Sequence, residues 1–117
     1  MTSIPLPGKP VRGSRTGRPV MALLNFLGRR WVLRILWELR EEPLGFRALQ
    51  ARCDNLSPTI LSRRLNELRS MAIATQGEGG EYALTRAGKK LCNVILPLHF
   101  WAQDWAARLL NENQKTK

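Results

Sequence analysis

The sequence has little of what catalytic and metal sites usually contain. It holds one histidine, His99, and two cysteines, Cys53 and Cys92. Two cysteines make no disulfide framework, and no Cys/His group has the spacing of metal ligands. His99 lies in an apolar stretch, where a core or interface histidine is the more common case, and no carboxylate pair or nucleophile–base arrangement is evident. We therefore expect no enzymatic activity, no metal and no cofactor.

Long apolar runs are also missing. No run approaches the roughly 18 residues that a membrane-spanning helix needs, and the N-terminus lacks the apolar centre of a signal peptide. These absences favour a cytoplasmic protein. Cys53 falls where an apolar core residue is expected and Cys92 lies within the last predicted helices, so we interpret both as buried thiols.

Acidic residues are scarce relative to basic ones. The chain has 9 Asp and Glu against 19 Lys and Arg, a formal net charge of +10. Most of these cations are arginine, which makes bidentate contacts to phosphate and guanine that lysine cannot make. The balance favours a polyanionic partner such as DNA, RNA or an anionic membrane surface, and a solvated charged surface is the competing interpretation.

Residues 1–19 form a predicted flexible, basic N-terminal arm. The segment has four prolines, three glycines and no acidic residue, and it shows no helical or alternating pattern. Its cations include Arg12, Arg15 and Arg18. Residues 15–19 loosely resemble the Gly-Arg-Pro core of AT-hooks, whose arginines lie in a narrow minor groove. A solubilising tail is the alternative.

Residues 20–110 are predicted to form one domain. A first helix over 20–27 ends at Gly28, a residue type suited to the left-handed end of a helix. A second helix over 29–40 turns an apolar stripe inward and carries Arg29, Arg30 and Arg34 near its start. Cations there are unfavourable for the helix dipole, so we interpret them either as phosphate contacts or as groups packed over tryptophan rings. A short helix over 46–53 follows, with Arg47 outward.

The stretch 57–69 is predicted to be an amphipathic helix, with Ser57 as its N-cap and Pro58 as its first residue. Helical spacing places Leu61, Leu65 and Leu68 on one face. The opposite face carries hydroxyl, guanidinium and amide groups and no acid. Such groups can read base edges in a major groove; the face consists of Thr59, Ser62, Arg63 and Asn66. A short helix, a turn and a longer helix in sequence make a helix-turn-helix unit.

After this unit the periodicity changes. Residues 73–76 and 81–85 are predicted strands joined by a glycine-rich turn, a small hairpin that would form a wing. Thr85 is expected to cap a further helix, which Pro97 kinks or divides before a final helix to Leu110. Residues 111–117 are expected to be a polar, frayed tail.

The first and last helices carry more bulky apolar surface than a small winged domain requires. We expect this surface to bind a second copy of the chain. The alternative is that the last helix folds back onto the first. The expected dimer contacts are Leu23, Leu24, Leu98, Trp101, Trp105 and Leu109.

From about residue 20 to 105 the chain resembles the HxlR-type winged helix-turn-helix regulators, relatives of the MarR-like group. Four ordered segments carry the resemblance: Gly-Arg-Arg-Trp at 28–31, Pro-Leu-Gly-Phe-Arg-Ala-Leu at 43–49, Leu-Ser-Pro-Thr-Ile-Leu-Ser-Arg-Arg-Leu-Asn-Glu-Leu at 56–68, and Tyr-Ala-Leu-Thr-Arg-Ala-Gly at 82–88. The resemblance implies a mainly α fold with a small β-hairpin. It also implies a homodimeric DNA-binding regulator whose first and last helices form the dimer contacts.

Three features depart from this family's pattern. The wing is short and carries Glu78 and Glu81, which argues against a strong DNA contact there. Ala72 occupies a position that is often glycine, so we expect a negative φ at this turn. Redox-sensing members have a cysteine just before the first helix, and this chain has Arg18-Pro-Val there, so a similar thiol switch is not expected.

The leading hypothesis is a transcriptional regulator that binds double-stranded DNA as a homodimer at a pseudo-palindromic operator, with helix 57–69 in the major groove. Expected DNA contacts are Ser57, Thr59, Ser62, Arg63, Asn66, Arg64, Arg47 and Arg30. A winged-helix protein–protein assembly module without specific DNA readout is the alternative. RNA binding is less favoured because only Tyr82 offers an aromatic ring near this surface.

Overall fold

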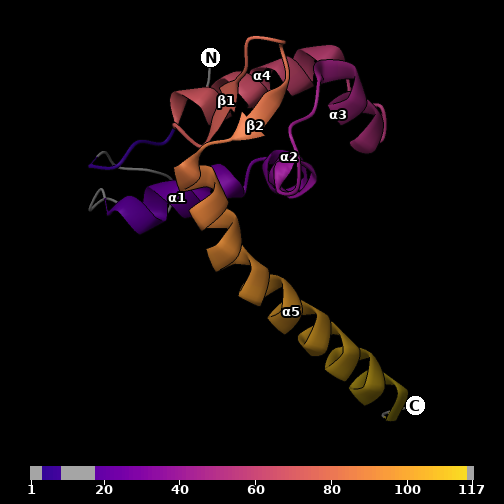
Figure 1. The fold of residues 1–117 in the computed structure, drawn as a ribbon. Coiled ribbons are helices and arrows are strands. Elements are labelled where there is room, and N and C mark those ends of the chain that lie inside the picture. Colours follow the sequence, from indigo (N-terminus) through magenta and orange to yellow (C-terminus); the bar gives the residue numbers. More distant parts are fainter. Residues whose placement is uncertain (1–3, 9–17, 116–117) are drawn as a thin grey trace.

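The computed structural model describes residues 4–8 and 18–115. Its elements are α1 (Pro19–Leu27), α2 (Val32–Leu39), α3 (Phe46–Arg52), α4 (Pro58–Ser70), β1 (Ala74–Gln76), β2 (Tyr82–Leu84) and α5 (Arg86–Lys115) (Figure 1). The two strands are antiparallel, with Thr75 opposite Ala83, and Leu44 adds an isolated bridge to Tyr82. The predicted class, mainly α with a small hairpin in a winged helix-turn-helix, is confirmed.

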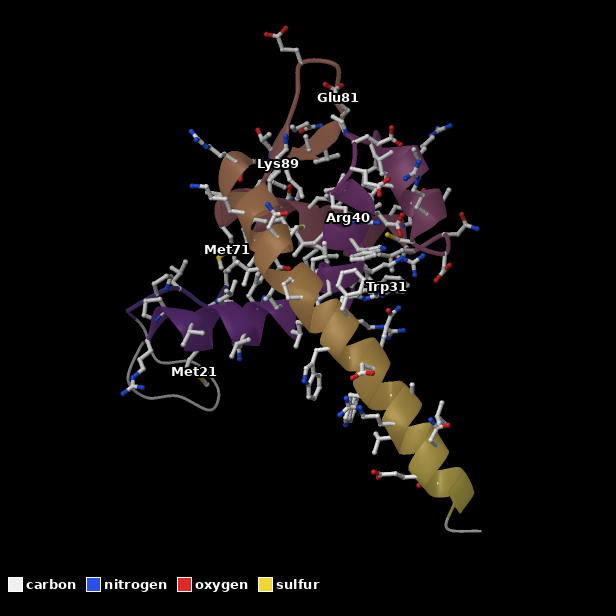
Figure 2. The ribbon with its side chains drawn as sticks, turned by 60° about the horizontal axis from the view of Figure 1, so that its bottom comes forward. Met21, Trp31, Arg40, Met71, Glu81 and Lys89 are labelled. Carbon is white, nitrogen blue, oxygen red and sulfur yellow. The ribbon has the colours of Figure 1, made fainter. Side chains whose placement is uncertain are left out.

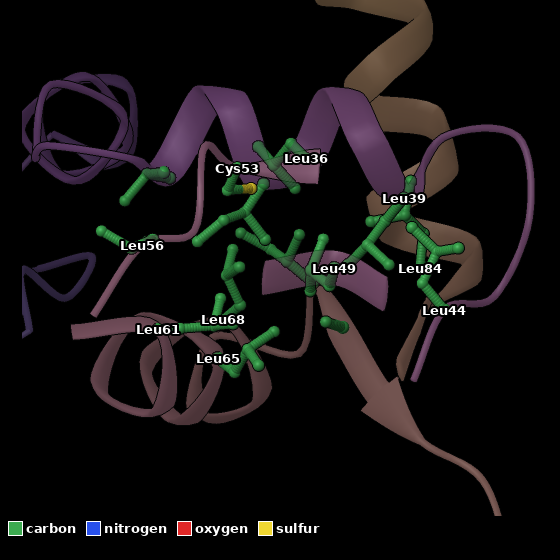
Figure 3. Packing of buried hydrophobic residues seen from close by; sticks show 14 of the residues in the cluster. Leu36, Leu39, Leu44, Leu49, Cys53, Leu56, Leu61, Leu65, Leu68 and Leu84 are labelled. Carbon is green, nitrogen blue, oxygen red and sulfur yellow. The ribbon is translucent and has the colours of Figure 1, made fainter. Parts of the chain in front are cut away.

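The core lies between α2, α3, α4 and the base of the hairpin (Figure 3). Leu61, Leu65 and Leu68 of α4 are all 0% exposed, as their spacing predicts. They pack with buried residues of α2 and α3, including Ile35 and Leu49. Full burial of each leucine contributes about 1.5–3 kcal/mol relative to exposure, so this face fixes how α4 sits on the domain.

The turn between α1 and α2 differs from the prediction. Helix α2 begins at Val32 rather than at residue 29, and Trp31 before it has a φ of 77°. Gly28, expected in the left-handed region, has a φ of −77°. This turn places the Arg29 side chain and the Arg30 carbonyl oxygen in hydrogen-bonding contact with side chains of α4.

The turn between α4 and β1 also corrects a prediction, because Ala72 has a φ of 58° instead of a negative value. The amide of Ile73 donates to the Leu68 carbonyl at 2.9 Å, and that of Ala72 to the Arg69 carbonyl at 3.0 Å. This is the Schellman pattern, which places the residue after the C-cap in the left-handed region. The required hydrogen bonds therefore override the preference of alanine for negative φ.

Replacing Ala72 with Gly is expected to raise the free energy of unfolding by about 1 kcal/mol, because an L-residue is disfavoured at positive φ and glycine is not. Urea denaturation of the two proteins measures the change. Ala48→Gly, at an exposed position inside α3, is the matched control and should lower stability by about 1 kcal/mol. A loss of stability in Ala72→Gly would contradict the assigned turn.

Helix α5 is a single helix of 30 residues with Pro97 inside it. Of the two effects predicted for Pro97, a kink or a division, the division is therefore wrong. The helix also continues through Lys115, past Leu110, where we expected a frayed tail to begin. Its start is capped as predicted, since the amide of Gly88 donates to the Thr85 hydroxyl at 3.0 Å. From there α5 extends away from the other elements (Figure 1). None of the helices described is both long enough and apolar enough to cross a membrane.

Candidate nucleic-acid interface

One face of α4 is exposed and carries no acid. Thr59, Ser62, Arg63 and Asn66 are all exposed, opposite the buried leucines. The hydroxyl, guanidinium and amide groups therefore project together from a helix whose other face is fixed in the core. Within the described residues, none of these four side chains forms a hydrogen bond or ion pair. This arrangement leaves their donors and acceptors available to an external partner.

Ser57 is exposed at the start of α4, and Pro58 is the first helical residue as predicted. The expected cap is absent, because no side-chain hydrogen bond caps the helix. The Ser57 backbone has φ −48° and ψ 131°, and its hydroxyl forms no capping hydrogen bond to the first turn. The N-terminal amides of a helix attract phosphate when no side chain caps them.

The turn between α3 and α4 sets the angle of α4. Asp54 and Asn55 both have a φ of 57°, a conformation that Asp and Asn tolerate better than other side chains. Gln50 stabilises the turn by donating from Nε2 to the Leu56 carbonyl at 2.9 Å. The turn predicted between the short helix and the helix over 57–69 is thus present, and with it the helix-turn-helix unit.

A buried carboxylate that the sequence reasoning missed holds α4 against the α1–α2 turn. Glu67 is 7% exposed. Its Oε2 accepts from Arg29 Nη1 at 2.8 Å, and its Oε1 accepts from Arg64 Nη1 at 2.6 Å. Arg64 Nε also donates to the Arg30 carbonyl at 2.8 Å. The i, i+3 spacing of Arg64 and Glu67 was the available sequence signal.

These contacts revise two expectations. Arg64, expected on phosphate, is mostly buried, with a side chain 15% exposed, and it bonds within the protein. Arg34 similarly bonds Glu38 at 3.0 Å and the Arg52 carbonyl at 2.6 Å. Arg30 remains exposed, with its guanidinium carbon 5.9 Å from the Trp31 ring centroid. Packing over tryptophan and internal ion pairs therefore account for much of the basic cluster at the start of α2.

Replacing Glu67 with Gln is expected to lower the free energy of unfolding by about 3 kcal/mol, because two partly buried arginines lose their counter-charge. Urea unfolding measures the loss. Glu41→Gln is the matched control: the Glu41 side chain is 74% exposed and pairs with Arg40, so its loss should stay below about 1 kcal/mol. Equal losses in the two variants would contradict a structural role for Glu67.

The remaining predicted basic contacts divide into two groups. Arg47 on α3 and Arg63 on α4 are exposed, and neither forms an ion pair within the described residues. Arg18 is exposed immediately before α1. Arg12 and Arg15 lie outside the described residues. Two exposed arginines on the helix-turn-helix unit therefore remain available for phosphate or base contacts.

An open polar groove between α4 and β1 adds residues that the sequence reasoning did not single out. It is lined by Asn66, Arg69, Ser70 and Thr75, together with the small side chain of Ala74. Arg69 and Ser70 are exposed. Arg69 lies one turn beyond Asn66. The exposed, acid-free face of α4 therefore continues past Asn66 toward the wing. The i, i+3 spacing from Asn66 was the sequence signal that could have identified Arg69.

The wing carries acids and no cation. Residues 74–84 contain Glu78 and Glu81 but no Lys or Arg. The Glu81 carboxylate folds back over the turn, where a Cβ at Gly77 or Gly79 would collide with it (Figure 2). Glu78 is exposed. An acidic wing repels phosphate, so the cations near α4 must supply the charge complementarity to a polyanion.

Apolar side chains form an exposed stripe along α5. Val94, Leu98, Trp101, Trp105 and Leu109 follow one another at intervals of three or four residues and are 41–73% exposed. The rings of Trp101 and Trp105 stack with centroids 5.9 Å apart. This spacing places the five on one side of the helix. Val94 was not among the residues expected there.

Two further observations bear on this apolar surface. Leu24 of α1 is 55% exposed, whereas Leu23 is half-buried. Because the α5 stripe is exposed, the alternative in which the last helix folds back onto the first does not describe this structure. His99, interpreted as a core or interface residue, is half-buried with its ring centroid 4.8 Å from that of Trp37.

The thiols lie in different environments. Cys53 is 0% exposed, as predicted, whereas Cys92 is half-buried. Burial raises the pKa of Cys53, with Arg34 opposing the shift. Burial also raises the pKa of Cys92, opposed by Arg40. Raised pKa values keep both thiols protonated near neutral pH, which makes them weak nucleophiles.

Comparison with known proteins places this arrangement in a family. Residues 26–109 match the family described as HxlR-like helix-turn-helix. YvaP of Bacillus subtilis, an HTH-type transcriptional regulator, is 31% identical over 88 residues, which cover 70% of this chain and 82% of YvaP.

Solved structures agree with the sequence matches. Quinone-bound YodB from B. subtilis superposes with a TM-score of 0.69 at 27% identity, over 73% of this chain and 96% of YodB. A protein from Thermoplasma volcanium described as a possible HxlR family transcriptional factor gives a TM-score of 0.64 at 26% identity, over 72% of this chain and 81% of the other. The family match covers the helix-turn-helix unit, the hairpin and most of α5. The chain belongs to the HxlR-like helix-turn-helix family of transcriptional regulators.

Proposed function

We propose that the protein binds double-stranded DNA sequence-specifically as a homodimer and thereby regulates transcription. The observation that carries the proposal is the exposed, acid-free face of α4, backed by leucines that are fully buried. A helix held rigidly behind and rich in donors in front suits insertion into the major groove. The net charge of +10 supplies the long-range attraction to phosphate.

Side-chain chemistry assigns roles within this face. Arg63 matches guanine, because its guanidinium can donate two parallel bonds to O6 and N7, and Asn66 matches adenine. The shorter side chains of Thr59 and Ser62 add hydrogen bonds to base edges that lie close to the helix. Phosphate contacts fall to Arg47, Arg30 and the start of α4 at Ser57. Arg69 lines the groove at the other end of α4, together with Asn66. The basic arm with Arg12, Arg15 and Arg18 adds affinity for DNA phosphates that the acidic wing cannot contribute.

The homodimer is supported by the stripe on α5. Five large apolar side chains on one side of a helix expose a surface that water disfavours, and a second copy of the same helix provides a matching one. Leu24 and Val20 of α1 are also exposed, at 55% and 56%, and we assign them to the same proposed interface. A two-fold axis through such an interface would present two copies of α4 to successive turns of one DNA face.

Selection of bound DNA from a random duplex pool tests the proposal. The expected product is a pseudo-palindrome with half-sites about 34–36 Å apart, one helical turn of DNA. An enriched single half-site would retain DNA reading but reject the dimer. Absence of any enriched sequence would reject specific readout and favour the assembly-module alternative.

Arg63→Ala and Asn66→Ala are each expected to weaken binding to the selected sequence by about 10- to 100-fold, because a good side-chain contact to a base contributes about 1–3 kcal/mol of discrimination. Fluorescence anisotropy at fixed salt measures the change. The matched control is Arg108→Ala, which removes one exposed cation near the far end of α5 and should change binding by less than about threefold. Unchanged binding in both α4 variants is the outcome expected of an assembly module.

A further inference from the structure

A cleft of about 380 Å³ lies between α2 and the first turns of α5, with the end of β2 at its edge. Its apolar lining includes Leu36, Leu84, Ile95 and Leu96. Leu36 is 1% exposed and Leu84 is 5% exposed, so the cleft reaches the surface of the core. Binding sites for small organic molecules typically enclose about 300–1,000 Å³ and have mainly apolar walls.

The charged groups of this cleft are unequal. Arg40 is fixed in place: its guanidinium lies 3.7 Å from the Trp37 ring centroid, and its Nη1 donates to the Trp37 carbonyl at 2.8 Å. Glu41 pairs with Arg40 at 3.1 Å, which neutralises the acid of the lining. Lys89 is exposed and has no ion pair within the described residues. The cleft therefore combines an apolar wall with one uncompensated cation.

We propose that this cleft binds a small hydrophobic monocarboxylate, with its apolar body against Leu36 and Ile95 and its carboxylate at Lys89. The residues determine the class of ligand. A neutral apolar molecule would leave the charge of Lys89 unused, and a dicarboxylate would bring its second charge against apolar walls, at a desolvation cost. A cation would face Lys89 and Arg40. Figure 2 shows both side chains near the N-terminal part of α5.

Cys92 provides a reporter inside the cleft. It lines the same cavity, and its Sγ lies 4.0 Å from the Leu36 carbonyl oxygen. Cys53 is 0% exposed in the core, so alkylation of the folded protein is expected at Cys92. An occupant of the cleft covers this thiol and must slow its alkylation. The tryptic peptides that contain the two cysteines differ, so mass spectrometry follows each separately.

The test uses the full chain without DNA, so its result is independent of the proposed DNA binding. The probe is 1-naphthoate, and 1-naphthamide is its neutral counterpart of nearly equal shape. Calorimetric titration measures affinity, and iodoacetamide labelling of Cys92 at one fixed alkaline pH measures protection. We expect 1-naphthoate to bind about fivefold more tightly than 1-naphthamide, the effect of one exposed ion pair. It should protect Cys92 with the same half-saturation concentration.

Three variants locate the site. Lys89→Met keeps most of the aliphatic stem, and it should weaken 1-naphthoate about fivefold and abolish its advantage over the amide. Lys90→Met is the matched control, since Lys90 is exposed but does not line the cleft, and it should retain the wild-type affinity. Asn93→Trp fills the cleft from an exposed position and should abolish both binding and protection.

Several results would overturn the proposal. These are absence of both heat and protection at millimolar probe, equal affinity for acid and amide in the wild-type protein, or equal losses in Lys89→Met and Lys90→Met. Binding that persists in Asn93→Trp would place the probe elsewhere. Circular dichroism of each variant verifies that the helices are retained, and all three substitutions lie at exposed positions of α5.

Discussion

Gly88→Ala is expected to lower the free energy of unfolding by about 3 kcal/mol or more, although alanine normally stabilises a helix relative to glycine by about 1 kcal/mol. Gly88 is buried in the first turn of α5. A Cβ there would overlap the carbonyl oxygen of Ile73, which is backbone and also accepts the Thr85 amide at 2.9 Å. The clash can be relieved only by moving α5 or the start of the hairpin.

The sign of the change in unfolding free energy separates two effects: helix propensity alone predicts that Gly88→Ala stabilises the protein, and the clash with Ile73 predicts that it destabilises it. Ala87→Gly, at the adjacent exposed position, serves as the control and should cost about 1 kcal/mol through helix propensity alone. Both variants are measured by urea denaturation at one protein concentration, because any self-association changes apparent stability. A Gly88→Ala protein that is as stable as the wild type would show that α5 does not meet the hairpin as closely as described.

Much of the helix-turn-helix unit could be predicted from sequence because its determinants are local. Leu61, Leu65 and Leu68 repeat with the period of a helix, and Pro58 marks its start. Asp54 and Asn55 tolerate the left-handed turn that precedes it. The exposed face of α4 lies opposite the buried one, so helical spacing alone predicts that Arg63 is exposed, as it is.

The features that sequence reasoning missed depend on contacts between distant segments. Glu67 looks like any surface acid of an amphipathic helix until Arg29, 38 positions away, is brought beside it. Glu67 also accepts a hydrogen bond from Arg64, so the Arg64 guanidinium is held inside the protein and is not available to phosphate. Ala72 is left-handed because backbone hydrogen bonds close the end of α4. In each case a tertiary contact overrides a local preference.

In helix α5 the sequence-based prediction gave too much weight to one proline. Pro97 suggested a break, because proline removes a backbone donor and crowds the preceding turn. The helix nevertheless continues through it. A single backbone donor is lost, and the apolar stripe continues across the proline from Val94 to Leu98. The sequence predicted the apolar residues after Pro97, from Leu98 to Leu109, on one helix, but not the continuation of the stripe across the proline to Val94.

The double substitution Trp101→Glu, Trp105→Glu is expected to raise the dissociation constant of the proposed dimer by at least about 1,000-fold. Buried tryptophans at interfaces commonly contribute about 2 kcal/mol or more each, and a two-fold interface loses every contact twice. Both rings are at least half-exposed in the single chain, at 62% and 50%, so the substitutions remove no core packing. Sedimentation equilibrium measures the dissociation constant.

The same variant separates dimer formation from DNA reading. If two copies of α4 read two half-sites, loss of the dimer should reduce affinity for the palindrome to that for an isolated half-site, while Arg63 and Asn66 still discriminate bases. Gln103→Glu, an exposed substitution on α5 outside the apolar stripe, is the matched control for added negative charge and should leave the dimer intact. A Trp101→Glu, Trp105→Glu protein that still sediments as a dimer would place the interface on another surface. Dimer loss with undiminished affinity for the palindrome would instead show that one protomer is sufficient to bind the operator.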